Sequence, residues 1–193
     1  VDEQLGREVT VVVAPATLPE TPRSWGWMLQ LYALHSGGSW GIGDLGDLRE
    51  FVEWTGREHG AEAVLLNPLH AITPVPPVQA SPYTPSSRRF ATPLALRVTD
   101  LDAYRTADDD TRAQVDVLRP DTTGDRIEHD RVWAAKRSAC ELLWHSAGRP
   151  EPIGAPDDLW QFAIFCALAE RYGSHWSRWP EGLRHPAAPD VDR

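Results

Sequence analysis

The 193-residue sequence is short of several features, and each shortage excludes a class of protein. It contains only two cysteines, Cys140 and Cys166, both within apolar helical patterns, which predicts reduced core thiols in a cytoplasmic protein and not a disulfide framework. No apolar run approaches the roughly 18 to 20 residues of a membrane span, and no signal peptide opens the sequence. The 19 Lys and Arg are outnumbered by 28 Asp and Glu, so the formal charge of -9 disfavours nucleic acids and anionic membranes as partners.

Proline and tryptophan, in contrast, are abundant, with 17 and 9 residues. Proline fixes φ and removes a hydrogen-bond donor, so many prolines predict many defined loops. A single tryptophan usually indicates core packing, but its flat apolar face also suits a sugar ring. For the nine together both interpretations stay open.

The two ends of the sequence indicate a piece of a longer polypeptide, because it starts with Val1 instead of Met and finishes in a Pro- and Asp-rich stretch. The β-branched residues 10–13 predict a short strand, and a proline-rich linker follows it. We therefore expect residues 1–22 to be the end of a preceding β domain with its linker, and residues 23–193 to form the main domain.

A strand, a loop, a helix and a second strand follow one another in the main domain. Residues 25–34 are nearly all apolar, which is typical of a parallel strand that is buried on both faces. After a glycine-rich loop, Asp44 or Asp47 can cap a helix that ends at Gly60, and residues 63–66 predict the next strand. This order predicts a βαβ unit with a right-handed parallel crossover, and so an α/β fold. The expected apolar face of the helix consists of Leu45, Leu48, Phe51 and Val52.

The rest of the sequence predicts one weak strand and three helices. The strand covers residues 94–98. The helices run from Asp108 to near Pro120, over 131–144, and from Asp157 or Asp158 to Tyr172. We expect the last helix to bury Leu159, Phe162, Ile164, Phe165 and Leu168.

Common cofactor and metal motifs are missing from the sequence. The glycines between residues 37 and 43 match neither dinucleotide nor Walker spacing, and Trp40 among them is too bulky for a pyrophosphate cradle. No metal-binding spacing of His or Cys and no Gly-x-Ser-x-Gly elbow is present. Asp44 and Asp47 look like a carboxylate pair, although helix capping explains them better. We expect no cofactor and no metal.

The loop after the second strand has a composition that suits a sugar. Residues 81–90 hold Tyr83 between two prolines, together with four hydroxyl side chains and two arginines. A stiff loop of this kind can stack an aromatic ring on the C–H face of a neutral polyhydroxylated ligand. A rigid surface turn, with Arg88 and Arg89 solvated or paired to acids, explains the same residues.

Four segments in order closely resemble the start of the catalytic barrel of the 4-alpha-glucanotransferase family (amylomaltases, glycoside hydrolase family 77). They are QLYAL at 30–34, SWGIGDLGDL at 39–48, LNPLHA at 66–71 and SPYTPSSRRF at 81–90. The resemblance is tight over most of residues 24–98 and loose afterwards. It implies the first part of a (β/α)8 TIM barrel that is incomplete in this chain, because a full barrel needs about 250 residues.

The resemblance also implies an activity, the transfer of α-1,4-glucan segments between maltodextrins with retention of configuration. Such enzymes use an Asp nucleophile and a Glu acid/base, both of which lie on later strands of this family's barrel. We therefore assign no catalytic residue to this chain and expect it to be inactive alone. Its expected partners are α-1,4-glucans and the remainder of the barrel.

What carries over from the family is a sugar-binding platform. The expected substrate-binding residues are Ser81, Tyr83, Asn67, His70, Trp40 and Asp44. Tyr83 matches the tyrosine that stacks at the cleavage subsite, while loop anchoring is the favoured role for Asp44. One departure is Thr92-Pro93-Leu94, where the family usually has Asn-Pro-Leu, so a sugar contact from Thr92 is in doubt. A non-catalytic carbohydrate-binding or scaffold protein and a generic α/β domain remain as alternatives.

Overall fold

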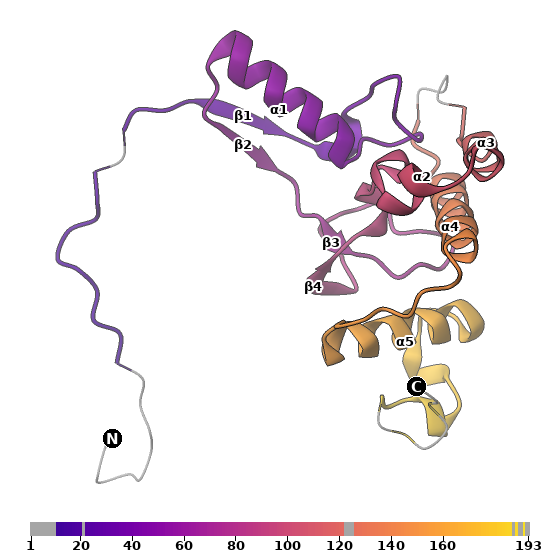
Figure 1. The fold of residues 1–193 in the computed structure, drawn as a ribbon. Coiled ribbons are helices and arrows are strands. Elements are labelled where there is room, and N and C mark those ends of the chain that lie inside the picture. Colours follow the sequence, from indigo (N-terminus) through magenta and orange to yellow (C-terminus); the bar gives the residue numbers. More distant parts are fainter. Residues whose placement is uncertain (1–10, 21, 122–125, 187, 189–190, 192–193) are drawn as a thin grey trace, which may run out of the picture.

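The computed structural model describes residues 11–20, 22–121, 126–186, 188 and 191, and it combines short strands with five α-helices in that part of the chain (Figure 1). The strands are β1 (Gly26–Leu29), β2 (Ala63–Leu66), β3 (His70–Ala71) and β4 (Ser87–Ala91). The helices are α1 (Leu45–His59), α2 (Asp102–Thr106), α3 (Asp109–Val117), α4 (His129–Ser146) and α5 (Asp157–Tyr172).

The expected βαβ unit is present. β1 and β2 pair in parallel from Gly26 opposite Ala63 to Leu29 opposite Leu66, and α1 connects them. The pairing needs a glycine at its start, because a Cβ on Gly26 would lie 2.1 Å from the carbonyl oxygen of Ala63. The helix packs against β1 through Trp27, whose indole Nε1 donates to the Thr55 hydroxyl at 2.6 Å.

The first strand is shorter and more exposed than the sequence predicts. It ends at Leu29, and a 3-10 turn at residues 31–33 follows. Met28 is 81 % exposed and Leu65 on β2 is 62 % exposed, so the expectation of a strand buried on both faces is wrong for this chain. The physical reason is that α1 covers only part of a two-stranded sheet (Figure 1).

Helix α1 begins and ends where the sequence predicts. The carboxylate of Asp44 accepts from the amides of Gly46 and Asp47, and the Asp47 side chain accepts in return from the Asp44 amide, which is a capping box. Gly60 closes the helix with a left-handed φ of 64°, a conformation that glycine adopts without steric cost. Asp44 is thus the N-cap. The expected apolar face is only partly buried, since Leu45 and Val52 are each more than 40 % exposed.

Residues 70–101 form structure that the sequence analysis did not predict. β3 and β4 pair antiparallel, so the two ends of the loop between them lie next to each other. The predicted strand at residues 94–98 is wrong: it consists of two 3-10 turns, at residues 93–95 and 98–100. Pro93 lacks the amide that a strand ladder needs, and the Thr92 hydroxyl caps the first turn by accepting from the Leu94 amide at 3.4 Å.

Helix α4 lies at the centre of the larger core. Trp40, Val98, Val115, Ala139 and Leu143 form one buried cluster, to which α3 and α4 contribute the last three. The predicted helices at 108–120 and 131–144 are confirmed within a few residues, whereas α2 was missed. Helices α3 and α4 therefore pack around Trp40, which lies in the glycine-rich loop after β1.

Helix α5 matches its predicted bounds and stops before Gly173, but it is less buried than expected. It packs through aromatic rings: Phe162 stacks on Phe90 of β4 at 4.8 Å, and Phe165 lies tilted against Trp179 at 5.5 Å, both measured between ring centroids. Leu159 is 40 % exposed, and only Ala169 on this helix is fully buried. The prediction of five buried apolar side chains is thus wrong in degree, because α5 packs on one side of the body only (Figure 1).

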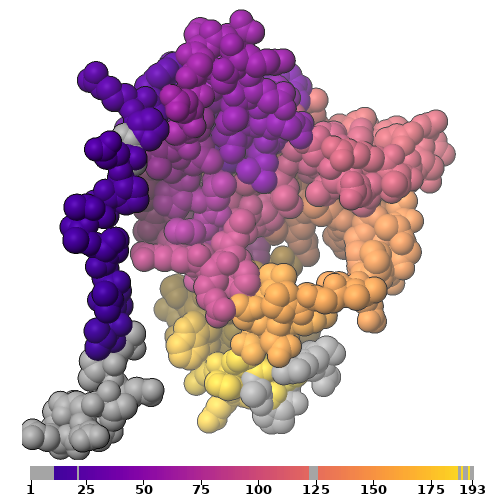
Figure 2. Space-filling model, turned by 60° about the vertical axis from the view of Figure 1, so that its left-hand side comes forward, coloured from indigo at the N-terminus to yellow at the C-terminus, as the bar shows by residue number. Residues whose placement is uncertain are grey.

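Residues 11–20, drawn in indigo, run outside the body as an extended segment (Figures 1 and 2). Val11, Val12 and Val13 are each at least 79 % exposed and belong to no strand. The predicted strand at 10–13 is therefore wrong over these three residues, and Thr10 lies outside the described residues. Among the residues that the structure describes, no strand pairs with this β-branched run. In the described part of the chain no helix has the length and apolar character to cross a membrane.

Candidate functional site

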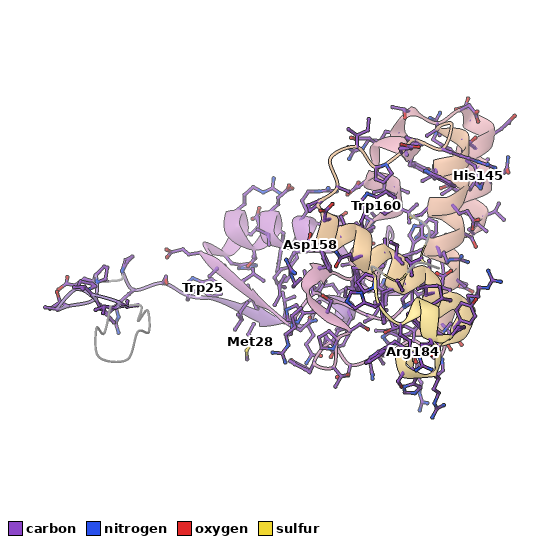
Figure 3. The ribbon with its side chains drawn as sticks, turned by 90° about the horizontal axis from the view of Figure 1, so that it is seen from below. Trp25, Met28, His145, Asp158, Trp160 and Arg184 are labelled. Atoms are coloured by element: carbon purple, nitrogen blue, oxygen red, sulfur yellow. The ribbon has the colours of Figure 1, made fainter. Side chains whose placement is uncertain are left out.

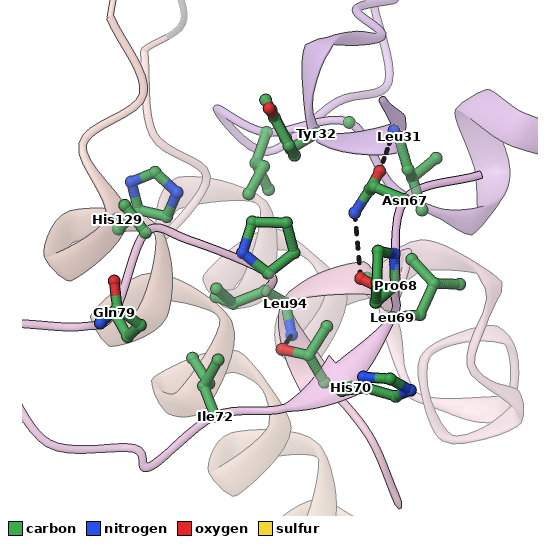
Figure 4. A pocket seen from close by; sticks show the side chains of 16 residues that line it. Leu31, Tyr32, Asn67, Pro68, Leu69, His70, Ile72, Gln79, Leu94 and His129 are labelled. Atoms are coloured by element: carbon green, nitrogen blue, oxygen red, sulfur yellow. Dashed lines mark hydrogen bonds between the residues drawn. The ribbon is translucent and has the colours of Figure 1, made fainter. Parts of the chain in front are cut away.

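A small cavity opens at the carboxyl ends of β1 and β2, the face where α/β proteins bind ligands (Figure 4). Its free volume is about 50 Å³, which suits a hydroxyl group or a water molecule and not a whole sugar ring. The lining comes from Leu31, Tyr32, Ile42, Gly43, residues 67–70, Ile72, residues 79–80, Pro82, Thr92, Leu94, Ala95 and His129.

Asn67 joins the ends of the two parallel strands. Its Oδ1 accepts from the Leu31 amide at 2.7 Å, and its Nδ2 donates to the Pro68 carbonyl at 3.0 Å (Figure 4). Both the oxygen and the nitrogen of the Asn67 carboxamide thus bond to backbone groups, which fixes the backbone at the floor of the cavity. Asn67 has one further Nδ2 proton and one Oδ1 lone pair for a ligand.

Two histidines border the same cavity. His70 begins β3, three residues after Asn67, and His129 is the first residue of α4. Figure 4 shows them on different sides of the pocket, with Gln79 beside His129. Both imidazoles are half-buried. They give the cavity hydrogen-bonding groups from segments far apart in sequence.

The proline-flanked loop forms the rim of the cavity. Pro82 lines it, the Ser81 amide donates to Gln79 Oε1 at 3.0 Å, and the Ser81 hydroxyl accepts from the Tyr83 amide at 3.4 Å. Tyr83 is 63 % exposed, and within the described residues its side chain makes no hydrogen bond or ring contact. Tyr83, next to the lining residue Pro82, is therefore an exposed aromatic ring close to the cavity. Arg89 at the end of this loop pairs with Asp158 on α5.

Trp40 lies in the core and not at the site. Its side chain is fully buried against Val98, Val115, Ala139 and Leu143, so it has no surface for a sugar in this structure. The expectation that Trp40 contacts substrate is corrected on this ground. The reason is tertiary: α3 and α4 close over the glycine-rich loop, and no local sequence signal predicts this closure.

Asp44 is also fully buried and acts as an anchor. Besides capping α1, its carboxylate accepts from Arg97 Nε at 2.7 and 2.8 Å. The direct sugar contact expected from Asp44 is thus replaced by the loop-anchoring role, which the sequence analysis favoured. Asp47 accepts from the hydroxyls of Ser36 and Ser39, and Arg97 Nη2 lies 2.7 Å from Asp47 Oδ1.

The glycines near this anchor make room for an arginine, not for a phosphate. A Cβ on Gly38 would lie 2.1 Å from Arg97 Nη1, and a Cβ on Gly46 would lie 2.6 Å from Arg97 Cζ. The guanidinium group occupies the space that these side chains would take. The sequence predicted neither the anchoring role of Arg97 nor the need for glycine beside its guanidinium group.

Burial and ion pairing shift several pKa values behind the cavity. Burial would raise the pKa of Asp47, but hydrogen bonds from Ser36, the Asp44 amide and Ser39 hold it below its usual range. Burial lowers the pKa of Lys136 to about 8, although the Asp44 charge opposes the shift. Burial works against the charged form of Arg97 too, yet Asp44 keeps the pKa of that guanidinium above its ordinary value. Charge is therefore retained in this interior by pairing.

Lys136 was missed by the sequence analysis although a signal exists. It is the only lysine among 19 Lys and Arg residues, and it lies within the apolar pattern of α4. Tyr32, Gln79 and His129 were missed as lining residues, since no spacing in the sequence connects them.

Comparisons with known proteins agree with one another. A sequence model of the 4-alpha-glucanotransferase family matches residues 29–193. The chain is 42 % identical over 212 residues to the 4-alpha-glucanotransferase of Mycobacterium tuberculosis strain H37Rv, an alignment that covers 98 % of the chain and 29 % of that protein. The Haemophilus influenzae 4-alpha-glucanotransferase is 32 % identical over 158 residues, covering 75 % of the chain and 22 % of that protein.

A solved structure extends the likeness to the fold. The crystal structure of amylomaltase from Corynebacterium glutamicum superposes with a TM-score of 0.58 at 31 % identity, covering 80 % of this chain and 21 % of that one. The chain thus spans less than a third of the length of these relatives.

Proposed function

The chain belongs to the 4-alpha-glucanotransferase family, and from this premise we propose that it takes part in transferring α-1,4-glucan segments between maltodextrins with retention of configuration. In retaining transfer a carboxylate forms a covalent glycosyl intermediate, and a second carboxyl group acts as acid and then base. We place both groups outside residues 1–193. The role of this chain is to bind and orient the glucan.

The observation that carries this proposal is the exposed face of Tyr83 at the rim of the cavity. The ring is free of partners within the described residues, the flanking Pro82 and Pro85 restrict the backbone, and Pro82 reaches the cavity wall. A glucose ring stacked on Tyr83 would bury C–H surface against the aromatic face. One of its hydroxyl groups would then enter the small cavity.

The other site residues act around this stacked ring. His70 would donate or accept a hydrogen bond at the cavity wall, and the Ser81 hydroxyl would contact a sugar oxygen from the rim. Asn67 would offer its remaining amide proton while it holds the strand ends together. Trp40 and Asp44 act through the loop that they support.

The proposed frame for this site is the first part of a (β/α)8 barrel at residues 23–193, with residues 1–22 as the end of a preceding β domain and linker. The exposed strands support it, because Met28 and Leu65 leave apolar surface on the β1–β2 pair that further strands would bury (Figure 3 shows Trp25 and Met28). The remainder of the barrel is then the partner of this chain. The two free thiols, Cys140 and Cys166, fit a cytoplasmic setting.

The test is substitution of Tyr83 in the natural full-length protein, with maltotriose disproportionation as the readout. Tyr83→Ala should lower transfer about tenfold or more, which corresponds to about 1.4 kcal/mol, because the stacking surface is lost. Tyr83→Phe keeps the ring and should keep most of the activity. Tyr172→Ala removes a partly exposed tyrosine from α5 and serves as the matched control. Unchanged kinetics in Tyr83→Ala would rule out the stacking role.

A further inference from the structure

The loop that carries Tyr83 is attached to helix α4 through a single residue, Val78. This Tyr83 loop covers residues 72–86, between β3 and β4. Val78 is 7 % exposed, and its side chain belongs to a buried apolar cluster that includes Val132 on α4. Its backbone amide donates to Asp130 Oδ1 on the same helix at 2.6 Å. Both the side chain and the backbone of Val78 therefore fix the loop to α4.

The bond to Asp130 differs from the other hydrogen bonds of the Tyr83 loop. At the base of the loop, the Ser86 amide donates to the Ala71 carbonyl on β3 at 3.0 Å. Among the described residues, the remaining hydrogen bonds of residues 74–85 join members of the loop to one another. In the described part of the chain, the Val78–Asp130 bond is thus the one hydrogen bond that ties residues 74–85 to another element.

Short-range bonds connect Val78 to Tyr83. Gln79 follows Val78 directly, and its Oε1 accepts from the Ser81 amide at 3.0 Å. The Ser81 hydroxyl accepts in turn from the Tyr83 amide at 3.4 Å. Pro82, between these two residues, has a restricted φ and lines the cavity. A segment held in this way moves as a unit, so a shift at Val78 would displace the Tyr83 ring.

The start of α4 lies beside this part of the loop. Asp130 is the second residue of the helix, and His129 before it lines the cavity. Figure 4 shows His129 next to Gln79, the residue that follows Val78. Asp130 is exposed apart from its bond to the loop, so its replacement leaves the core intact.

We propose that Asp130 is a positioning residue for glucan transfer, which holds the Tyr83 ring in place through the Val78 amide. This inference rests on the proposed function, because it assigns a purpose to a fixed Tyr83. Asp130 acts through the loop and not by touching the glucan. Misplacement of a binding group by about 1 Å can lower a rate by up to about a hundredfold, so a bond at this distance from the chemistry can affect transfer.

The alternative is that Asp130 only stabilises α4. An acidic side chain in the first turn of a helix interacts favourably with the positive end of the helix dipole. Glu128 offers the same charge at the same helix end, but its carboxylate pairs with Arg131 at 3.2 Å and not with the loop. Helix stabilisation therefore predicts similar effects at positions 128 and 130, whereas positioning predicts an effect at position 130 alone.

The first test is maltotriose disproportionation by the natural full-length protein. Asp130→Ala should lower kcat/KM about fivefold, because the loop loses its bond to α4. Asp130→Asn keeps an oxygen acceptor and should retain most of the activity, and the matched control Glu128→Ala should leave it unchanged. In a Tyr83→Ala background, Asp130→Ala should have no further effect, because both changes act through the same ring. An equal loss in both backgrounds, or a similar loss in Glu128→Ala, would overturn the positioning role.

Hydrogen exchange in the same full-length proteins tests the contact without any sugar. Asp130→Ala should accelerate exchange of the Val78 amide about tenfold or more, and Asp130→Asn should accelerate it less, since a neutral oxygen accepts more weakly than a carboxylate. Glu128→Ala should not change it. Should Asp130→Ala fail to fold, Asp130→Asn carries the test, and unchanged exchange at Val78 would refute the contact.

The outcomes separate this inference from the proposed function. If Tyr83→Ala lowers transfer and Asp130→Ala does not, the positioning role is overturned and the proposed function stands. If Tyr83→Ala leaves transfer unchanged, the stacking role fails instead. Exchange at Val78 then decides by itself whether Asp130 holds the loop.

Discussion

At the scale of single residues, buried charged side chains lie behind the candidate site and hold its surroundings in place. Asp44 has three tasks at once, because it caps α1, pairs with Arg97 and faces Lys136. Tyr83, in contrast, has no partner among the described residues and remains free for a ligand. The functional proposal therefore depends on one exposed ring and on a buried group of charges that supports its surroundings.

The shifted pKa of Lys136 predicts how stability depends on pH. Burial lowers this pKa from 10.5 to about 8, so the folded state loses the proton first. Between pH 8 and 10.5 the unfolded state binds more protons, and the free energy of unfolding must rise with pH through this group, by up to about 3 kcal/mol. Urea denaturation of the chain and of Lys136→Met at pH 7 to 10 measures it. The difference between the two proteins should grow with pH in favour of the unmodified chain, and a constant difference would contradict the shifted pKa.

At the scale of elements, the buried ion pairs of Arg97 with Asp44 and Asp47 reverse the usual effect of glycine on the stability of a helix. Helix α1 contains Gly46 in its first turn and Gly56 near its end. Alanine normally stabilises a helix by up to about 1 kcal/mol relative to glycine. A Cβ on Gly46 would meet Arg97 Cζ at 2.6 Å, whereas the nearest atom to a Cβ on Gly56 is 4.0 Å away.

The two glycines of α1 therefore give opposite predictions. Gly46→Ala should destabilise the chain by about 1 to 3 kcal/mol, because Arg97 must leave its place between Asp44 and Asp47. Gly56→Ala should be neutral or stabilising. Thermal unfolding of both variants checks this, and equal shifts in the two proteins would show that the guanidinium group yields without cost.

Elements with local signals could be predicted from the sequence, and those that depend on distant contacts could not. Asp44 and Gly60 mark both ends of α1, and the β1–α1–β2 order follows from such signals. Residues 94–98 are apolar except for Arg97 and look like a strand, yet they form turns, with Pro93 before them and the Leu94 carbonyl bonded to Lys136. The composition of the segment around Tyr83 suggested a sugar site, and this role stays a prediction. Trp40 was misplaced because only the packing of α3 and α4 decides its burial.

At the scale of the whole molecule, apolar surface is unevenly distributed. Val132, Ala139 and Leu143 of α4 are buried, while Trp27, Met28 and Leu65 on the β1–β2 pair, and Trp25 just before β1, are exposed. A free, apolar strand pair is a template for further strand pairing and for self-association. The proposed barrel explains this apolar surface, because its further strands would bury it.

This surface makes opposite predictions for the chain and for the natural full-length protein. In the 193-residue chain, Met28→Lys should reduce self-association, measured by sedimentation, because it places a charge on an exposed apolar strand. In the full-length protein the same change should lower the unfolding temperature strongly, since a barrel would bury position 28 and leave the charge unpaired. Val117→Lys, at an 84 % exposed position on α3, is the matched control and should leave the full-length protein unaffected. If Met28→Lys were equally harmless there, the surface would be exposed in the full-length protein too, and the barrel proposal would fail.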